Sequence, residues 1–472
     1  MFDAVLVANR GEIAVRVIAT LKRLGIRSIA VYSEADQDAM HVKLADTAVC
    51  VGQPPAAGSY LNIDAILDAA DRAGADAIHP GYGFLAENAK FAQAVADRGL
   101  AFVGPSPQVI SEMGSKINAR RIMADAGVPT VPGLLEPVDS ADAALASADG
   151  IGYPVAVKAS GAGGGKGFRI AHNPDELPAA FHGAQSEGER FFNDSTVYLE
   201  RYLADPRHVE VQVLGDTLGN VVHLYDRDCT IQRRHQKLVE EAPTPTIDED
   251  FRRRICAQAM DAARAIGYVG AGTVEGLVTG SRSGEPEFFF LEMNTRIQVE
   301  HGITEMITGV DIVEQQLRAA AGQPLSVEQD EVRIDGHAIE VRINAENAAK
   351  GFLPSAGTIT RYKEPTGAGV RVDSGVREGT AILPHYDSLL AKVLVHGATR
   401  EDATARMRRA LDEFVLEGPK ATLLPFHRAL LATDEWANAG TAREITADPR
   451  TFMAQAGTTQ SETPSPTGSA SA

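Results

Sequence analysis

The sequence predicts a mixed α/β protein, α+β overall, on three observations. Strand and helix patterns alternate over residues 1–113, as expected for a parallel α/β domain. Longer strand patterns and a glycine-rich loop occupy residues 114–331. Short strand patterns separated by turns fill residues 332–452 and indicate a mainly antiparallel β domain. At 472 residues the chain is long enough for these three domains.

The first domain is predicted from four strand patterns and the helical patterns between them. Strands are expected at 4–8, 27–33, 77–79 and 101–103, and helices at 12–23 and 63–73. The turn after the first strand, Asn9-Arg10-Gly11-Glu12, lacks the glycine fingerprint of a dinucleotide fold, which argues against a nicotinamide enzyme. A second turn, at 79–88, mixes glycine with aromatic and charged residues and is either a binding turn or a well-packed one.

The central domain combines a glycine-rich loop with two lysines. A strand pattern at 153–159 carries Lys158, and the loop Ser160-Gly161-Ala162-Gly163-Gly164-Gly165-Lys166-Gly167 follows directly. It is not a P-loop, because Gly167 stands where a hydroxyl residue would bind magnesium. Glycines alone suit a flexible linker, but lysines beside a strand favour a mobile lid that closes over a triphosphate.

The chain has a formal net charge of −18, so an anionic substrate needs a local group of basic residues. The run Gln232-Arg233-Arg234-His235-Gln236-Lys237 supplies one between strand patterns, although a solvated face is the alternative. Further strands are expected at 197–202, 208–214, 221–226, from 227 onward and at 272–277, with helices at 250–267 and 311–321. The negative charge also disfavours binding to nucleic acids or anionic membranes.

Polar and apolar residues alternate after an aromatic strand pattern at 288–293. If the backbone stays extended, one side receives the side chains of Glu292, Asn294, Arg296, Gln298 and Glu300. That side then offers oxygen ligands for magnesium, a guanidinium for an oxyanion and a carboxylate base. A half-buried strand with a solvated face would show the same alternation.

Two other strand patterns extend this candidate site. Glu275 lies on a pattern that would pair antiparallel with the Glu292 strand and bring Glu275, Glu292 and Asn294 around magnesium. A buried, hydrogen-bonded acid is the alternative for Glu275. Arg342 lies in a similar alternation at 337–346 and is a second cation aimed at the site. The remaining strands are expected at 358–362, 370–373 and 390–396, with a helix at 401–414.

The cysteines Cys50, Cys229 and Cys256 lie far apart, and we expect reduced packing residues rather than a disulfide or zinc site. The sequence shows no secretion signal and no long apolar segment, so we expect a cytoplasmic protein. We expect disorder over residues 453–472, because the Ser-, Thr-, Pro- and Gly-rich end offers little to bury.

Several long motifs, met in order, give the chain a resemblance to biotin carboxylase, the ATP-grasp component of biotin-dependent carboxylases. The resemblance covers about residues 1–452. Its motifs are Ala8-Asn9-Arg10-Gly11-Glu12-Ile13-Ala14, His79-Pro80-Gly81-Tyr82-Gly83-Phe84-Leu85, the loop at 163–167, Arg233-Arg234-His235-Gln236-Lys237, Glu292-Met293-Asn294-Thr295-Arg296-Ile297-Gln298-Val299-Glu300-His301 and Glu340-Val341-Arg342-Ile343-Asn344.

The resemblance implies an ATP-grasp domain at 114–331, with a mobile lid at about 132–204, and a C-terminal biotin carboxylase domain at 332–452. It implies an ATP-dependent ligase with two half-reactions. ATP first phosphorylates bicarbonate to carboxyphosphate, and the carboxyl group then passes to N1′ of biotin on a carrier protein. The implied ATP-binding residues are Lys116, Lys158, Gly164, Gly165, Lys166, Glu200, Leu203, His208, Gln232 and His235.

The resemblance also implies roles for the other candidates. Binding of Mg²⁺ or Mn²⁺ falls to Glu275, Glu292 and Asn294. Bicarbonate binding falls to Lys237, Arg296, Gln298 and the backbone of Val299. Glu300 would deprotonate bicarbonate, and Arg342 would stabilise the enolate oxygen of the biotin ureido ring. Tyr82 would line the biotin pocket.

The expected partners are a separate biotin carboxyl carrier protein and carboxyltransferase subunits, because the chain has no Met-Lys-Met biotinylation motif. The family implies a homodimer. The final acceptor stays open between an acyl-CoA, as in fatty acid biosynthesis, and urea or another acceptor, because Gly302-Ile303 replaces the Pro-Val of many members. Other hypotheses are a different ATP-grasp ligase and a non-catalytic nucleotide-binding scaffold.

Overall fold

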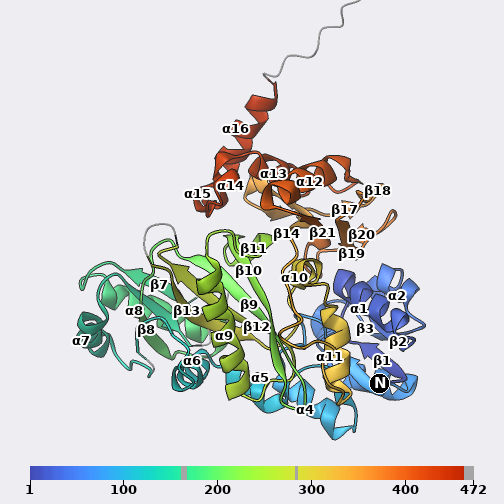
Figure 1. Ribbon diagram of the computed structural model, residues 1–472, viewed down its shortest axis with the longest axis horizontal. Coiled ribbons are helices and arrows are strands. Elements are labelled where there is room, and N and C mark those ends of the chain that lie inside the picture. The colour runs from blue at the N-terminus through green and yellow to red at the C-terminus, as the bar shows by residue number, and fades with distance from the viewer. Residues whose placement is uncertain (135, 161–166, 282–284, 462–472) are drawn as a thin grey trace, which may run out of the picture.

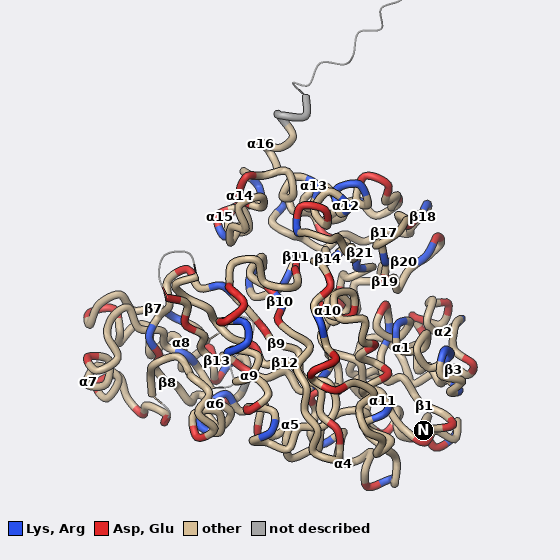
Figure 2. Tube along the Cα trace, in the orientation of Figure 1, with Lys and Arg blue, Asp and Glu red and all other residues tan. Residues whose placement is uncertain are grey.

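The computed structural model describes residues 1–134, 136–160, 167–281 and 285–461. Figure 1 shows the N-terminal sheet on one side of a large central sheet, with α7 and α8 at the far end and the C-terminal helices above both. Acidic and basic positions are mixed along all of these elements (Figure 2). Among the described segments, no helix has the length and apolar character that a bilayer crossing requires.

The N-terminal region contains a five-stranded parallel sheet in the order β3-β2-β1-β4-β5. Its strands are β1 (Ala4–Val7), β2 (Arg27–Ser33), β3 (Thr47–Gly52), β4 (Ala77–His79) and β5 (Ala101–Phe102). Its helices are α1 (Gly11–Arg23), α2 (Met40–Leu44), α3 (Ile63–Ala73), α4 (Ala89–Asp97) and α5 (Pro107–Gly114). The predicted parallel sheet is confirmed. The sequence prediction missed β3, an edge strand whose side chains are mostly half-exposed.

An eight-stranded antiparallel sheet, in the order β13-β12-β9-β10-β11-β14-β21-β19, joins the central and C-terminal regions. Its strands are β9 (Arg207–Gly215), β10 (Val221–Arg233), β11 (Gln236–Ala242), β12 (Gly270–Thr279), β13 (Glu287–Asn294), β14 (His337–Asn344), β19 (Val370–Ser374) and β21 (Leu389–Gly397). The two strands predicted at 221–226 and from 227 onward are one strand, β10, because a register shift between His223 and Asp226 interrupts its pairing without ending it. Helix α9 (Glu249–Ala265) packs on β9 and β10.

A smaller antiparallel sheet, in the order β7-β6-β8, forms the part of the chain predicted as a lid. It consists of β6 (Val155–Ala159), β7 (Phe168–Ala171) and β8 (Val197–Arg201), with α7 (Ala141–Ile151) and α8 (Leu177–Phe192) beside it. Helix α6 (Lys116–Asp125) precedes it in the chain. The predicted lid residues Gly164, Gly165 and Lys166 lie outside the described residues.

The part of the large sheet formed by β14 and β21 has two different faces. One face is apolar and packs on α12 (Arg400–Glu413) through residues such as Val341 and Val393. Because side chains alternate along a strand, the other face carries Glu340, Arg342 and Lys392. This charged face lies toward α1 of the N-terminal region, since Lys392 and Glu12 are within ion-pair distance.

The rest of the C-terminal region consists of short elements. The strands are β15 (Glu346–Asn347), β16 (Leu353–Pro354), β17 (Gly357–Thr358), β18 (Arg361–Lys363), β20 (Ala381–Ile382) and β22 (Val415–Glu417). The helices are α13 (Leu424–Leu431), α14 (Asp434–Ala437), α15 (Arg443–Ala447) and α16 (Pro449–Ser461). Two more helices, α10 (His301–Thr308) and α11 (Ile312–Ala320), precede this region in the chain.

Two sequence expectations need correction. Helix α16 continues to Ser461, so helix replaces the disorder expected for 453–461, and residues 462–472 lie outside the described residues. All three cysteines are free thiols, but only Cys229 and Cys256 are buried. The packing role expected for Cys50 is therefore wrong, because its strand β3 lies at the exposed edge of the sheet.

Candidate active site

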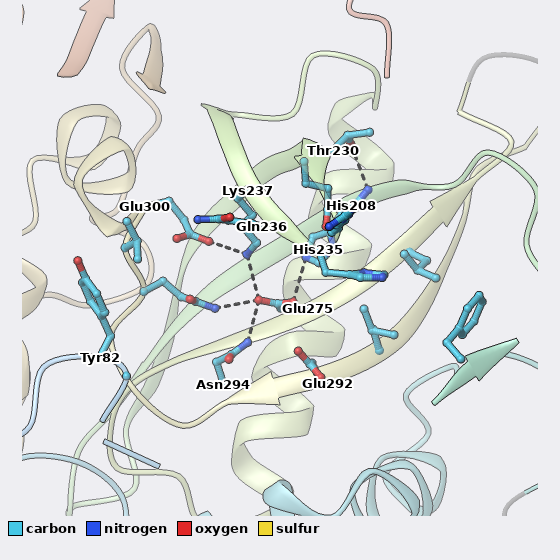
Figure 3. Close-up of a pocket in the computed structure, with 18 of the residues that line it drawn as sticks. Tyr82, His208, Thr230, His235, Gln236, Lys237, Glu275, Glu292, Asn294 and Glu300 are labelled. Atoms are coloured by element: carbon cyan, nitrogen blue, oxygen red, sulfur yellow. Dashed lines mark hydrogen bonds and ion pairs between the residues drawn. The ribbon is translucent and has the colours of Figure 1, made fainter. Parts of the chain in front are cut away.

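One cavity of about 1080 Å³ lies where the three regions of the chain meet (Figure 3). The site residues predicted from the sequence, outside the undescribed loop, all line it: Tyr82, Lys116, Lys158, Glu200, Leu203, His208, Gln232, His235, Lys237, Glu275, Glu292, Asn294, Arg296, Gln298, Val299, Glu300 and Arg342. Residues that are far apart in the sequence are thus brought to one place by the fold.

The strands β12 and β13 position the proposed metal ligands. They pair antiparallel, with Glu275 opposite Glu292, as the sequence predicted. Asn294 Nδ2 and Gln298 Nε2 each donate to Glu275 Oε1 at 2.8 Å, so the carboxylate of Glu275 gathers two neighbouring amides around it. The Glu292 carboxylate lies further out, 3.4 Å from the Lys116 ammonium.

The extended alternation predicted up to Glu300 is wrong, because β13 ends at Asn294 and the following residues form bends and a turn. Hydrogen bonds, not strand geometry, bring the later side chains into the cavity. Arg296 donates to Asn294 Oδ1 and to Gln298 Oε1, each at 2.9 Å. Its Nε donates to Glu87 at 2.8 Å, which holds the guanidinium from the N-terminal side.

The basic run seen in the sequence forms the hairpin between β10 and β11. Arg234 and His235 have φ values of 49° and 64°, which allow the tight turn that reverses the chain. Lys237, at the start of β11, points into the cavity and contacts Glu210, Glu275 at 3.0 Å and Glu300 at 2.5 Å. Its ammonium is therefore the cation that three buried carboxylates share.

Glu300 stands at the cap position before α10, almost fully buried, between two cations from different strands. Its Oε1 faces Lys237 and its Oε2 accepts from Arg342 at 2.9 Å. Burial alone would raise the pKa of Glu300, but Lys237, Arg342 and Arg227 lower it below the usual range of a carboxyl group. The carboxylate is thus ionised and able to accept a proton.

The turn at 79–88 reaches the cavity and is more than a packed turn. Asn9 Nδ2 donates to the carbonyls of Pro80 and Tyr82, at 2.8 and 2.7 Å, and so ties the turn to the one after β1. The Tyr82 hydroxyl donates to Glu12. Tyr82 lies across the cavity from Lys237 (Figure 3).

The far end of the cavity carries cations from the lid and from α6. Lys158 on β6 and Arg120 on α6 both contact the carboxylate of Glu200 on β8. Lys116 begins α6. Cations placed around an open cavity in this way suit the phosphates of a nucleotide.

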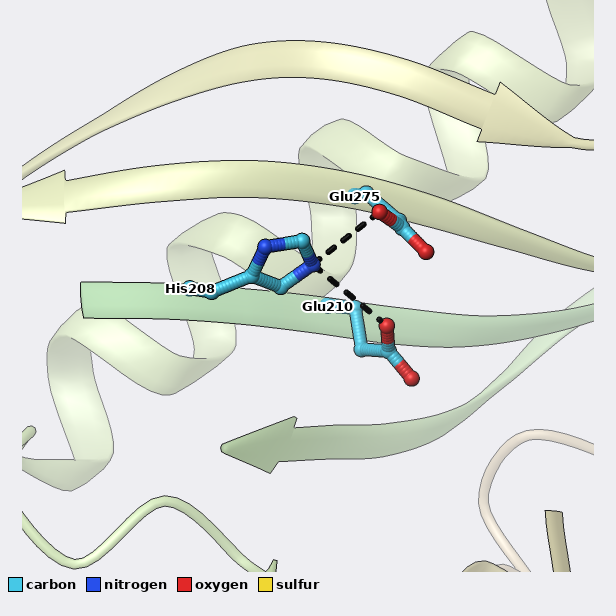
Figure 4. Close-up of side chains that lie close together, drawn as sticks. All are labelled: His208, Glu210 and Glu275. Carbon is cyan, nitrogen blue, oxygen red and sulfur yellow. Dashed lines mark ion pairs between the residues drawn. The ribbon is translucent and has the colours of Figure 1, made fainter. Parts of the chain in front are cut away.

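Within the described part of the chain, two groups of side chains have the composition of a metal site: His208, Glu210 and Glu275, and Glu210, Cys229 and Glu300. In Figure 4 the His208 ring points at both carboxylates, with Nε2 3.0 Å from Glu275. Since Lys237 already neutralises Glu210, Glu275 and Glu300, a cation centred there would meet an ammonium. Glu275 contacts Lys237 as well, but Glu292 and Asn294 on the adjacent strand line the open cavity beside it, and carboxylate and amide oxygens are ligands that suit Mg²⁺.

Comparisons with known proteins agree with this geometry. The family model for the biotin carboxylase N-terminal domain matches residues 1–110, that for the ATP-binding domain of the carbamoyl-phosphate synthase L chain matches 115–328, and that for the biotin carboxylase C-terminal domain matches 340–446. Biotin carboxylase 1 of Bacillus subtilis (strain 168) is 51% identical over 431 residues, which cover 91% of this chain and 95% of that protein. The chain belongs to the biotin carboxylase family.

Other members of the biotin carboxylase family are similarly close. The biotin carboxylase of Haemophilus influenzae is 51% identical over 442 residues, which cover 93% of this chain and 97% of that protein. The crystal structure of the biotin carboxylase domain dimer of Hydrogenobacter thermophilus 2-oxoglutarate carboxylase, with MgADP, ADP and bicarbonate, has a TM-score of 0.90 and 46% identity. That match covers 96% of this chain and 99% of that one. The resemblance inferred from the motifs is confirmed.

Sequence reasoning missed several side chains of this biotin carboxylase site. Glu210 follows His208 by two residues on β9, so strand alternation places both on one face. Glu87 lies in the turn at 79–88, where its carboxylate gave no local signal of a distant arginine partner. Tyr386 and Asp387 line the cavity from a loop between β20 and β21 that has no motif-like pattern.

Proposed function

We propose that this biotin carboxylase performs ATP- and bicarbonate-dependent carboxylation of biotin on a separate carrier protein, through carboxyphosphate. The observation that supports this most directly is the position of Glu300: a buried, ionised carboxylate between Lys237 and Arg342, beside Gln298 and Arg296. A base held among cations suits a substrate that is an anion and must lose a proton.

In the first half-reaction, Lys237, Arg296, Gln298 and the backbone of Val299 hold bicarbonate. Glu300 takes its proton as the oxygen attacks the γ-phosphorus of ATP, and the bond from the γ-phosphorus to the bridging oxygen breaks to release ADP. In this proposal, ATP is bound by Lys116, Lys158, Glu200, Leu203, His208, Gln232 and His235. Glu275, Glu292 and Asn294 would hold Mg²⁺ or Mn²⁺, which neutralises charge on the phosphates.

In the second half-reaction, the bond between the carboxyl carbon and the phosphate oxygen of carboxyphosphate breaks, the carboxyl group passes to N1′ of biotin, and the released phosphate takes the N1′ proton. Arg342 stabilises the oxygen of the ureido ring, where negative charge develops as N1′ loses its proton. Tyr82 lines the pocket for biotin. Arg342 contacts both Glu300 and Glu240, at 2.9 and 2.6 Å, so its guanidinium is held in place before substrate arrives.

The proposal leaves the final acceptor open. Relatives are named for pyruvate carboxylase, 2-oxoglutarate carboxylase and methylcrotonoyl-CoA carboxylase, so family membership alone does not select an acceptor. We propose that carrier and carboxyltransferase subunits supply that choice, and that the chain forms a homodimer.

The free thiols suit a reducing compartment, and we propose a cytoplasmic location. We also propose domains at 1–113, 114–331 and 332–452.

Replacement of the base tests the proposal. We expect Glu300→Gln to abolish bicarbonate-dependent ATP hydrolysis, because the amide cannot accept the proton, while ATP binding is largely retained. The measurements are ADP release with and without bicarbonate and the Kd of ATP by calorimetry. Glu189→Gln, an exposed acid on α8, is the matched control and should behave as wild type.

A normal turnover rate in Glu300→Gln would contradict the assigned role of Glu300. ATP hydrolysis by the wild-type protein that ignores both bicarbonate and free biotin would favour the alternative, a different ATP-grasp ligase that activates another carboxylate. The cations and the ionised Glu300 in one cavity argue against a non-catalytic scaffold, since such a protein needs no base.

A further inference from the structure

Lys392 lies on β21, on the charged face of the large sheet, and its side chain is 0% exposed. It is paired across the sheet with Arg342 on β14 and with Asp373 on β19. Lys392 lies outside every motif that the sequence offered. Burial of an ammonium is unfavourable unless hydrogen bonds and opposite charges stabilise it. The groups around Lys392 therefore indicate its role.

The ammonium of Lys392 donates a hydrogen bond to the backbone carbonyl of Val299. Three carboxylates surround it at longer distances: Asp373 at 3.6 Å, Glu12 at 3.7 Å and Glu340 at 3.9 Å. Asp373, the closest of the three, balances the charge of the ammonium most directly, and the hydrogen bond fixes the direction in which the ammonium points. Lys392 therefore holds one defined backbone atom of the segment before α10.

That segment carries the proposed bicarbonate contacts. Val299 stands between Gln298, whose amide donates to Glu275, and Glu300, the proposed base. The neighbouring carbonyl of Gln298 is bound by the His301 ring at 2.7 Å. Two successive carbonyls are thus held, one by Lys392 of the sheet and one by His301 of α10, while Gln298, Val299 and Glu300 line the cavity.

Lys392 also reaches the biotin side of the cavity through Glu12. One oxygen of Glu12 accepts from the Tyr82 hydroxyl. The other, Oε2, is buried without a hydrogen-bond partner among the described residues and faces the Lys392 ammonium. Glu12 lies in the first turn of α1 in the N-terminal region, so a single lysine connects that region to the segment around Val299.

We propose that Lys392 is a positioning residue that sets the distance between the bicarbonate and biotin subsites. It fixes the Val299 carbonyl by a hydrogen bond and Glu12, and through it Tyr82, by charge. The inference rests on the proposed function, because the two subsites are defined by it. Lys392 itself contacts no substrate in this proposal; it acts through Val299 and Glu12.

The test separates the two subsites kinetically in the full-length protein. We expect Lys392→Met to raise the KM for bicarbonate and the KM for free biotin about tenfold each, the size expected for loss of a charge-assisted hydrogen bond. The Kd of ATP should change less than about twofold, because the lysine does not reach the nucleotide end. A merely structural role would lower the fraction of active protein, and so kcat, without raising either KM.

A second variant covers the case in which Lys392→Met does not fold because the buried Asp373 loses one of its counter-charges. Glu12→Gln keeps the lysine and an acceptor for the Tyr82 hydroxyl, but it removes the negative charge that faces the Lys392 ammonium. We expect it to raise the KM for biotin at least about fivefold more than the KM for bicarbonate, since the Val299 contact remains. Lys43→Met, which removes an exposed ammonium that pairs with Asp38, is the control and should match wild type.

The outcomes are distinct. Unchanged KM values in a folded Lys392→Met protein would overturn the proposal, and so would equal effects of Glu12→Gln on both substrates. If instead the wild-type protein shows no bicarbonate-dependent ATP hydrolysis, the proposed function fails before the variants are compared.

Discussion

At the scale of single residues, the site is a set of buried charges that are balanced in pairs and triplets. Burial favours the neutral form of a carboxylic acid, and Glu300 remains ionised because Lys237 and Arg342 face it from two strands. Glu340 has no such hydrogen-bonded cation among the described residues, and burial raises its pKa well above the usual range. The same residue type thus favours the ionised form at one position and the protonated form at the other.

His427 gives a residue-scale prediction about pH. It is buried on α13, its Nε2 donates to the carbonyl of Arg342 at 2.8 Å, and burial lowers its pKa to about 4. An unfolded histidine has a pKa of about 6.5, so between these values the unfolded state binds more protons and folding is less favourable at lower pH. We expect the wild-type free energy of unfolding to fall by up to about 3 kcal/mol more than that of His427→Gln between pH 7 and pH 4.

Chemical denaturation at several pH values measures this difference. Glutamine keeps a donor for the Arg342 carbonyl but cannot be protonated in this range, so it isolates the titration from the hydrogen bond. If wild type and His427→Gln lose stability in parallel as the pH falls, His427 is not the group that titrates.

At the scale of elements, sequence patterns predict the bounds of a helix or strand well where the residues that stabilise it lie within the element itself. The bounds of β2 and α3 agree with the predicted 27–33 and 63–73, because their apolar spacing is complete within each element. The pairing of Glu275 with Glu292 also followed from two neighbouring strand patterns. The end of β13 at Asn294 could not be predicted in this way. The turn after Asn294 is stabilised by Glu87 from the N-terminal region, and a local sequence pattern does not contain such a distant contact.

Lys392 is a second residue whose contacts, all with distant parts of the chain, could not be predicted from the local sequence pattern. Its strand was predicted at 390–396, but a single lysine in an apolar strand gives no sign that its partners come from α1, β14 and β19. Motifs identified the candidate residues for binding substrates, which all line the cavity where the structure describes them. The residues that hold them in place became visible only once distant elements were brought together.

Helix α10 gives a prediction at the element scale. A Cβ built on Gly302, in its first turn, would lie 2.4 Å from Leu394 Cδ2 of β21, and Leu394 is fully buried. We therefore expect Gly302→Ala to destabilise the protein by about 1–3 kcal/mol, the usual range for an added methyl group in a packed core. Leu394→Val in the same chain removes the clashing atom and should restore most of the loss.

Thermal unfolding of Gly302→Ala, Leu394→Val and the double variant measures this coupling as a double-mutant cycle. Additive effects of the two substitutions would show that the helix moves away from the sheet instead. The contact between Gly302 and Leu394 gives a packing reason for the glycine at this position.

At the scale of the whole molecule, one sheet crosses the proposed boundary between the central and C-terminal domains. Strand β11 pairs with β14 from Val239 opposite Val341 to Ala242 opposite Ala338. Ion pairs cross the same line: Arg342 contacts Glu240, and Arg400 lies 2.6 Å from Glu241. The boundary near residue 331 is therefore a boundary in sequence, while backbone hydrogen bonds and buried charges continue through it.

This continuity predicts that the two domains unfold together. Opening β14 alone would leave the β11 edge unpaired and would leave Glu240 and Glu241 buried without their cations, which is unfavourable on both counts. We expect native-state hydrogen exchange to give the amides of β11 and β14 the same free energy of opening. Exchange from β14 and β21 at a clearly lower free energy than from β10 and β11 would contradict this. It would mean that residues 332–452 open as an independent unit and take Arg342 and Lys392 away from the cavity each time.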